Sequence, residues 1–152
     1  MIVKFMINTG WMLLLIVASG LIYIRIAPHN IVAVHVVPDS GSVLDQPMVK
    51  PGSALFSKRF QAPSAAILDR LNEVALASKR TRILAGSVEE GMITYVTRSL
   101  VFGFPDYTTV HVVANDQGSR VTIYGRLRFG ESDFGVNRTR ISAWLKALQP
   151  ID

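Results

Sequence analysis

The sequence contains no cysteine, and only three of its 152 residues are histidines. Without cysteine the chain has no disulfide, no thiolate metal site and no cysteine nucleophile. His29, His35 and His111 are too scattered along the sequence to match a known metal-binding spacing. A glycine-flanked serine nucleophile and a phosphate-binding glycine loop are also absent from the sequence. We therefore predict no catalytic residues, no metal site and no cofactor.

The chain also has little excess charge outside its N-terminal region. Its formal net charge is +5, from 16 basic and 11 acidic side chains. Lys4 and Arg25 flank the apolar segment described next, and without them the remaining net charge is only +3. This small excess gives no reason to expect nucleic acid as a partner. Basic residues concentrate between Ser119 and Lys146, and such a face suits anionic lipid or an acidic partner.

Residues Phe5 to Ile24 form a run of twenty residues without a formal charge. At about 1.5 Å per helical residue this run spans about 30 Å, which is the hydrocarbon thickness of a bilayer. The alternative is a cleaved secretory signal, but the run is longer than a signal core of about 7 to 15 residues and no small-x-small site follows it. We predict a retained transmembrane anchor over residues 1–26.

The orientation of this anchor follows from its position near the N-terminus. A short N-terminal tail, one anchor and a large C-terminal domain favour a domain outside the cytoplasm. The charge bias is small, because Lys4 on one side faces Arg25 and the more distant Lys50 on the other. A cytoplasmic domain is the alternative.

Residues 27–62 contain four prolines and a Ser-Gly-Ser cluster, and this composition predicts an extended connector. Within it, residues 31–37 are rich in β-branched side chains, which favours a strand that either joins the sheet of the domain or lies along a partner. The residues that we expect to contact a partner are Ile31, Val32, Val34, His35 and Val37.

The pattern from residue 63 onward predicts a small α+β domain over residues 63–152. A helical stripe of apolar residues begins at Pro63 and ends near Ser78, and a second helix carries Ile141, Trp144, Leu145 and Leu148. Between the helices the period changes to two, which predicts about four antiparallel strands with one face covered by both helices. The predicted strands are residues 82–86, 92–99, 108–114 and 119–129.

The stretch from Arg128 to Ile141, RFGESDFGVNRTRI, leads from the last strand into the last helix. It resembles the closing signature of the family catalogued as domain of unknown function 1499, and the resemblance extends back through FGFPD at Phe102 to Asp106. It covers roughly residues 62–148. The resemblance implies a membrane-anchored bacterial member of this family, but no activity, because the family itself has no agreed function.

This chain departs from the pattern of the family at three places. Members typically carry an R-S-x-S-R tract before the G-x-S-D motif, where this chain has Tyr124-Gly125-Arg126-Leu127-Arg128. The paired acids that often follow the F-G-F segment are here Asp106-Tyr107, and an N-C-V-S-S element has no counterpart. Chemistry that depended on those serines, that cysteine or the second acid is not expected here.

The motif predicts a structural polar corner made of Asp106, Ser132, Asp133 and Asn137. Asp133 or Ser132 would accept backbone N–H bonds at the start of the last helix, and Asn137 would point toward the sheet. An ion pair of Arg128 with Asp106 or Asp133 fits the same interpretation. The alternative is a binding site for an anion, in which Arg128, Arg138 and Arg140 surround the exposed N-terminus of the helix.

Three functions fit these features. The first is a non-enzymatic accessory or assembly subunit of a membrane protein complex in the bacterial inner membrane, with its domain on the periplasmic side. The second is a membrane-anchored module that binds an anionic ligand or a lipid headgroup through Arg128, Arg138 and Arg140. The third is an enzyme of unrecognised type, in which Asp106 or Asp133 would titrate near neutrality in a pocket.

Overall fold

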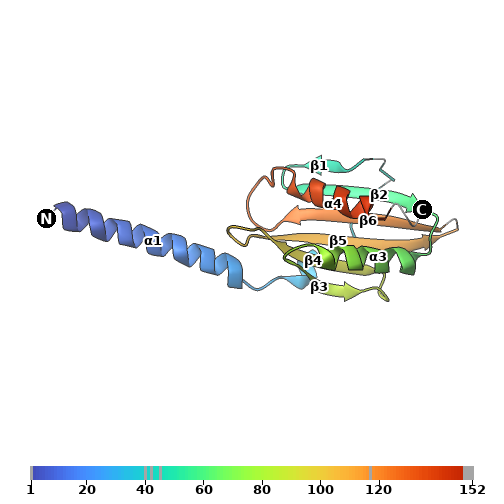
Figure 1. Ribbon diagram of the computed structural model, residues 1–152, viewed down its shortest axis with the longest axis horizontal. Helices are drawn as coiled ribbons and strands as arrows, with labels where there is room; N and C mark the ends of the chain where they lie inside the picture. The colour runs from blue at the N-terminus through green and yellow to red at the C-terminus, as the bar shows by residue number, and fades with distance from the viewer. Residues whose placement is uncertain (1, 40, 42, 45, 117, 149–152) are drawn as a thin grey trace.

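The structure is a computed structural model of the chain, and it describes residues 2–39, 41, 43–44, 46–116 and 118–148. Residues 149–152, which close the predicted domain, lie outside the described part. One long helix, α1, projects from one end of an α+β domain (Figure 1). The loop between β4 and β5 and the loop between β6 and α4 lie at the same end of the domain as α1 (Figure 1).

Helix α1 runs from Ile2 to Ile26, and none of its 25 residues is buried against the rest of the chain. At about 1.5 Å per residue it is about 37 Å long. A helix that is apolar on all sides and has no protein around it needs another apolar environment. Its length and composition are sufficient to cross a membrane, and a signal sequence near the N-terminus would meet the same criteria.

The sheet has six antiparallel strands in the order β1-β2-β6-β5-β4-β3, which corrects the prediction of about four. Strands β3 to β6 confirm the four predicted strands, with small differences at their ends. The bounds of the strands are Met48–Lys50 for β1, Ser53–Phe60 for β2, Thr81–Ser87 for β3, Met92–Arg98 for β4, Pro105–Asn115 for β5 and Gly118–Leu127 for β6.

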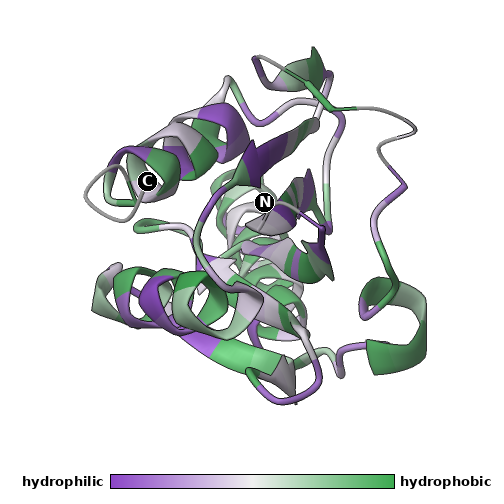
Figure 2. Cartoon of the chain, turned by 90° about the vertical axis from the view of Figure 1, so that its right-hand side faces the viewer, coloured by the Kyte–Doolittle hydropathy of each residue, from purple (hydrophilic) through white to green (hydrophobic). Residues whose placement is uncertain are grey.

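Helices α3 (Ser64–Ala77) and α4 (Val136–Lys146) cover one face of this sheet, as predicted (Figure 2). Tyr95 on β4 and Trp144 on α4 meet edge to face with ring centroids 5.5 Å apart, and Trp144 Nε1 donates to Ser78 Oγ at 2.9 Å. Burial of such side chains stabilises the fold by roughly 1.5–3 kcal/mol each. The buried apolar residues of this core include Phe56, Phe60, Ile67, Leu68, Leu71, Ile93, Val110, Val121, Ile123, Ile141 and Leu148.

The opposite face of the sheet is polar and is covered by residues 27–38, which we call the covering segment (Figure 2). Hydroxyl groups on neighbouring strands pair across this face, for example Thr94 with Thr109 at 3.0 Å and Ser57 with Thr122 at 3.2 Å. Buried hydroxyl groups need such partners, because an unpaired one loses its hydrogen bonds to water. The covering segment thus lies on a polar surface instead of an apolar core.

The two strands that the sequence analysis missed, β1 and β2, lie within the predicted extended connector. Strand β2 pairs with β6 along its whole length, from Ser53 opposite Arg126 to Phe60 opposite Ser119. The turn at Pro51-Gly52 joins β1 to β2, and Gly52 has a φ of 69°, which favours glycine. This proline-glycine pair between two short runs was the available hairpin signal.

The prediction of a strand at Ile31–Val37 was wrong. Residues Ile31–Val34 form the short helix α2, and Asn30 Oδ1 caps it by accepting a bond from the Ala33 N–H at 3.2 Å. The segment does not pair with an edge of the sheet but crosses its face, where side chains of the strands bind its backbone. Thr109 Oγ1 donates to the Val34 carbonyl at 3.2 Å, and β propensity is easily overridden by such contacts.

Candidate functional site

The polar corner between β6 and α4 is held together by Asp133. Its Oδ1 accepts the Gly135 N–H at 3.1 Å, and its Oδ2 accepts the Asn137 N–H at 2.8 Å. Burial raises the pKa of Asp133, but these backbone hydrogen bonds outweigh it and the pKa lies below its usual value. Asp133 therefore accepts backbone N–H groups at the start of α4, as predicted, but it is not the N-cap residue itself, because α4 begins at Val136 and Gly135 takes the N-cap position. Ser132 Oγ accepts only a long bond of 3.4 Å from the Phe134 N–H.

Asn137 points into the protein toward the sheet, as predicted, and is fully buried. A Cβ on Gly125 of β6 would lie 2.9 Å from Asn137 Oδ1 and 3.1 Å from Asn137 Cβ, so only glycine fits there. Asn137 Oδ1 accepts a bond from Arg140 Nη1 at 2.8 Å. The oxygen of this buried amide is therefore satisfied by an arginine side chain.

The ion pair of this corner joins Arg140 to Asp106, with 3.2 Å between Nη2 and Oδ2. Burial raises the pKa of Asp106, and the positive charge of Arg140 opposes that rise without cancelling it. The sequence analysis paired Arg128 with Asp106 or Asp133 instead. Arg140 takes that place because it projects from α4 onto the same face of the sheet as Asp106.

Arg128 lies on the other side of the sheet and binds the start of the covering segment. Its guanidinium donates to the carbonyls of Ala27 at 3.1 Å and Pro28 at 2.9 Å, and to His29 Nδ1 at 3.2 Å. The structure therefore does not gather Arg128, Arg138 and Arg140 into one anion site. Arg140 forms the ion pair of the polar corner, and Arg128 binds the backbone of the covering segment. Arg138 is exposed on α4.

His29 is positioned by Arg128 and Tyr107. Because an arginine can only donate, Nδ1 of His29 is the acceptor, and the Tyr107 hydroxyl, 2.9 Å away, donates to the same atom. Burial lowers the pKa of His29, and the positive charges of Arg128, Arg82 and Arg98 lower it further. His29 is thus a neutral imidazole in a strongly positive neighbourhood.

Arg126 is a second, half-buried cation beneath the covering segment. Its guanidinium donates to Thr109 Oγ1 at 3.2 Å and to the Val34 carbonyl, and it lies over the rings of Tyr124 and Tyr107. Burial lowers its pKa. Ile31, Val32, Val34, His35 and Val37, the predicted partner contacts, belong to this covering segment: Val34 and His35 bind the sheet, and the side chain of Val32 is 86% exposed.

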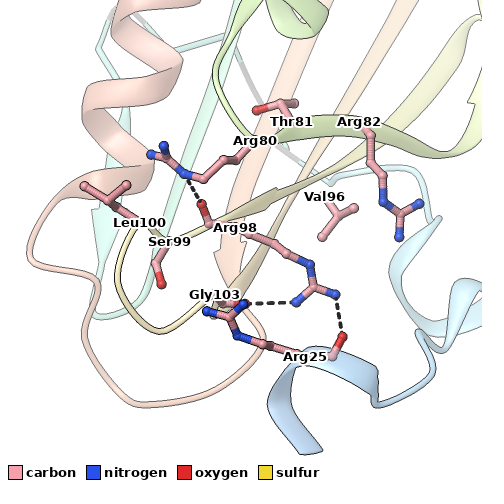
Figure 3. A pocket seen from close by; sticks show the side chains of 9 residues that line it. All are labelled: Arg25, Arg80, Thr81, Arg82, Val96, Arg98, Ser99, Leu100 and Gly103. Carbon is pink, nitrogen blue, oxygen red and sulfur yellow. Dashed lines mark hydrogen bonds between the residues drawn. The ribbon is translucent and has the colours of Figure 1, made fainter. Parts of the chain in front are cut away.

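A pocket of about 400 Å³ lies where β3, β4 and the last turn of α1 meet (Figure 3). Four arginines line it: Arg25 at the end of α1, Arg80 in the turn before β3, Arg82 on β3 and Arg98 on β4. None of the four forms a salt bridge within the described part of the chain. The remaining lining residues are Thr81, Val96, Ser99, Leu100 and Gly103, none of which is acidic.

Hydrogen bonds to backbone carbonyls hold the walls of this arginine pocket (Figure 3). Arg98 donates to the Gly103 carbonyl at 2.9 Å and to the Arg25 carbonyl at 3.0 Å. Arg80 Nε donates to the Arg98 carbonyl at 3.0 Å, and its backbone has a φ of 60°, which is uncommon for a residue with a side chain. Each guanidinium has five N–H donors, so donors remain for a ligand.

The sequence analysis missed this pocket. It treated Arg25 only as a residue that flanks the apolar segment. Lys79, Arg80 and Arg82 follow the last turn of a predicted helix, where cations suit the helix dipole, so they gave no sign of a site. The pocket depends on the pairing of β3 with β4. This pairing places Arg82 opposite Val96, and Val96 is two residues before Arg98 on β4. Pairing of β3 with β4 was predicted, but the return of the loop 99–104 to Arg25 was not. No pattern among neighbouring residues of the sequence predicts that contact, because it joins residues more than 70 positions apart.

Comparison with known proteins decides the family. Residues 33–148 match the family described as Protein of unknown function, DUF1499. The chain belongs to this DUF1499 family. The match begins before the segment of resemblance at residue 62 and includes β1, β2 and the second half of the covering segment. No curated protein matches the chain.

Solved structures with a similar shape come from several bacteria. Protein MLL2253 from Mesorhizobium loti is 9% identical with a TM-score of 0.47, over 66% of this chain and 98% of that chain. An uncharacterized protein from Rhizobium leguminosarum is 10% identical with a TM-score of 0.49, over 66% and 93%. Protein CV1439 from Chromobacterium violaceum is 13% identical with a TM-score of 0.46, over 65% and 94%. Likenesses of this size carry no information on function.

Proposed function

We propose that this DUF1499 protein is a single-pass protein of a bacterial inner membrane that binds the phosphate of an anionic phospholipid headgroup in the arginine pocket. The observation that carries the proposal is the position of four arginines beside the end of α1, none of which has an acidic partner among the residues that the structure describes. The sequence analysis gave binding of an anionic lipid headgroup as its second function, but at a different site. The proposed site is the arginine pocket instead of Arg128, Arg138 and Arg140.

The position of the pocket suits a headgroup. If α1 crosses the bilayer, Arg25, which follows the uncharged run, lies at the depth of the phosphates. The Arg98–Arg25 hydrogen bond then holds β4 at the same depth. A pocket at this level meets phospholipid headgroups at high local concentration, and no free ligand has to be captured from solution.

The chemistry of the pocket suits a phosphate. Guanidinium groups bind phosphate oxygens with two parallel hydrogen bonds, which are stronger than bonds between neutral groups. The pKa of the nearby His29 is lowered first by burial and by Arg128, and Arg82 and Arg98 of the pocket lower it further, which agrees with a local excess of positive charge. Basic pockets at the membrane surface are a known way of binding anionic lipid headgroups.

Three features support binding without catalysis. Asp133 is used in capping α4, and Asp106 is paired with Arg140 on the helix-covered side of the sheet, away from the arginine pocket. Among the described residues, no group of three or more histidines and carboxylates is placed to hold a metal ion. The arginine pocket itself contains donors and hydroxyl groups but no carboxylate or imidazole that could act as a base.

Lipid binding by the full-length protein in mild detergent tests this proposal. We expect short-chain phosphatidylglycerol to bind, and the double change Arg80→Gln with Arg82→Gln to weaken binding by roughly 100-fold or more, because each of the two lost charged hydrogen bonds is worth about 1.5–3 kcal/mol. Arg120→Gln with Arg138→Gln removes the same charge from exposed positions and is the matched control. Equal loss in both variants, or equal binding of short-chain phosphatidylcholine, would contradict the proposal.

An accessory role in a membrane protein complex is the second candidate. The observation that favours it is the outer surface of the covering segment, where Val32, Val36 and Val37 are 86%, 48% and 58% exposed. These three exposed valines, close to each other in the sequence and beside a membrane helix, provide an apolar surface that a neighbouring subunit could cover. The two candidates use different surfaces, so one variant set separates them.

A further inference from the structure

Two loops at the α1 end of the domain carry exposed apolar side chains. In the loop between β4 and β5, Leu100, Val101 and Phe102 are 75%, 69% and 50% exposed. In the loop between β6 and α4, Phe134 is 96% exposed. We propose that these two loops insert into the headgroup region of the same leaflet from which α1 emerges, so that the domain lies on the membrane with a fixed orientation.

The first loop is tied to the end of α1. Arg25 lies against the loop at two residues. Its Nη2 donates to the Val101 carbonyl at 3.5 Å, and its Nε is so close to Gly103 that a Cβ added there would lie 3.2 Å from it. Arg98 holds the Gly103 carbonyl from the other direction at 2.9 Å. The depth of Arg25 in the membrane therefore fixes the depth of the loop, and the loop tip must lie at the lipid surface if α1 spans the bilayer.

Contacts between three phenylalanine rings connect the second loop to the first. Phe104 contacts Phe102 at 5.8 Å between centroids and Phe129 at 6.5 Å. Phe129 begins the loop that carries Phe134. Both loops lie on the side of the domain that faces α1 in Figure 1.

Phe134 is difficult to explain within the protein alone. Its φ is 50°, in the left-handed region that disfavours bulky side chains, and asparagine or glycine would adopt it more easily. The side chain contributes no burial in return, because almost all of it is exposed. The loop is nevertheless fixed, since Asp133 accepts the Gly135 N–H and the Val136 N–H bonds the Asp133 carbonyl at 3.0 Å. A fixed, exposed phenylalanine is best accounted for by an apolar environment outside the chain.

Charge favours lipid over protein as that environment. Leu100 and Gly103 also line the arginine pocket, so exposed apolar side chains and cations lie on one surface. Interfacial membrane segments have this composition, with apolar side chains buried about 5–10 Å deep and basic groups at the phosphates. The inference rests on the membrane-crossing α1 of the proposed function, but not on phosphate binding in the arginine pocket.

The absence of cysteine allows a direct test with single-cysteine variants of the full-length protein. Leu100→Cys and Phe134→Cys would each carry a nitroxide label in vesicles of neutral phosphatidylcholine. Val113→Cys, 41% exposed on β5 near its hairpin to β6, is the matched control at the opposite end of the domain. We expect oxygen, which concentrates in lipid, to relax both loop labels at least threefold more than a water-soluble nickel complex does, and the reverse at Val113.

Loop labels as accessible to the nickel complex as the Val113 label would overturn the inference, and so would loop labels protected from both reagents, because protection from both indicates contact with protein. Neutral vesicles contain no anionic headgroup, so a failure of phosphate binding leaves this result unchanged. Conversely, Phe134→Ser should keep the affinity for short-chain phosphatidylglycerol in detergent, which separates the two proposals.

Discussion

Arg98 on β4 donates a hydrogen bond to the backbone carbonyl of Arg25, 3.0 Å away in the last turn of α1. A second bond from the same guanidinium reaches the Gly103 carbonyl at 2.9 Å. One side chain thus joins the long apolar helix, the sheet and the loop 99–104. The position of the domain relative to α1 depends on this arginine more than on any apolar contact, since α1 has no buried residue.

Arg98→Gln is expected to loosen the loop 99–104 and the end of α1 without unfolding the domain. A hydrogen bond from a charged donor is worth about 1.5–3 kcal/mol. Its loss should make the local opening of the loop easier, so that amide exchange there becomes at least roughly 10-fold faster than in the natural protein. Hydrogen exchange of the full-length protein in detergent measures this. Arg70→Gln removes an exposed pair with Glu73 and is the control, expected to change little. Unchanged exchange near residues 100–103 would show that Arg98 does not hold the loop.

Gly125→Ala is expected to destabilise the domain by about 1–3 kcal/mol, because the new methyl group would overlap Asn137 in a closed core. Asn137→Ala should cost a similar amount, since it leaves Arg140 without one of its acceptors. Thermal unfolding in detergent checks both changes. Ser132→Ala, which removes only a 3.4 Å bond, should shift the melting temperature little. Native-like melting of Gly125→Ala would mean that the corner can adjust.

The stability of the domain is expected to fall as the pH decreases through about 6.5. The pKa of His29 is lowered in the folded state, first by burial and then by Arg128, Arg82 and Arg98, and the pKa of His111 is lowered by burial and Arg120. The unfolded chain therefore takes up protons in a range where the folded chain does not, and this favours unfolding. His29→Asn retains an acceptor for Arg128 and Tyr107, and should reduce the pH dependence of the melting temperature.

His111→Gln is the companion variant for this pH dependence. His111 lies on β5 and His29 in the covering segment, and different arginines lower their pKa values, so their contributions should add. If the double variant keeps the full pH dependence of the natural protein, other groups cause it.

The family and the second half of the fold could be predicted from the sequence because their signals are local. The alternation in β3 to β6 and the apolar stripe Ile67, Leu68, Leu71 and Ala75 repeat at the period of their element. The capping role of Asp133 and the burial of Asn137 also depend on neighbours within a few residues. These predictions needed no knowledge of how distant segments meet.

The missed features all depend on contacts between distant segments. Strand β2 is defined by its pairing with β6, about 65 residues later, and the helix at Ile31–Val34 by side chains of β4, β5 and β6. The arginine pocket needs Arg25 to meet Gly103. The replacement of Arg128 by Arg140 as partner of Asp106 follows from the face of the sheet on which each lies. Apart from the Pro51-Gly52 turn between β1 and β2, local patterns in one sequence contain none of this information.

The domain is expected to lie outside the cytoplasm, with α1 retained as the anchor. The length of the uncharged run and its position near the N-terminus are the reasons. A reporter fused after Asp152 measures the orientation: alkaline phosphatase should be active and a cytoplasmic fluorescent reporter dark. The opposite pattern would place the domain in the cytoplasm, and release of the processed protein from the membrane fraction would show that α1 is a cleaved signal.

Val32→Ser with Val37→Ser tests whether the covering segment binds a membrane partner. Both side chains are more than half exposed, so the change should leave the bonds of Val34 and His35 to the sheet intact. If the protein is an accessory subunit that uses this surface, native purification in mild detergent should recover a partner at fixed stoichiometry with the natural chain and lose it with the variant. Leu76→Ser, at a 47% exposed position on α3, is the matched control and should retain the partner. Loss of the partner with Arg80→Gln and Arg82→Gln, but not with the valine changes, would instead make the arginine pocket the docking surface, and the accessory role would then depend on the same cations as lipid binding.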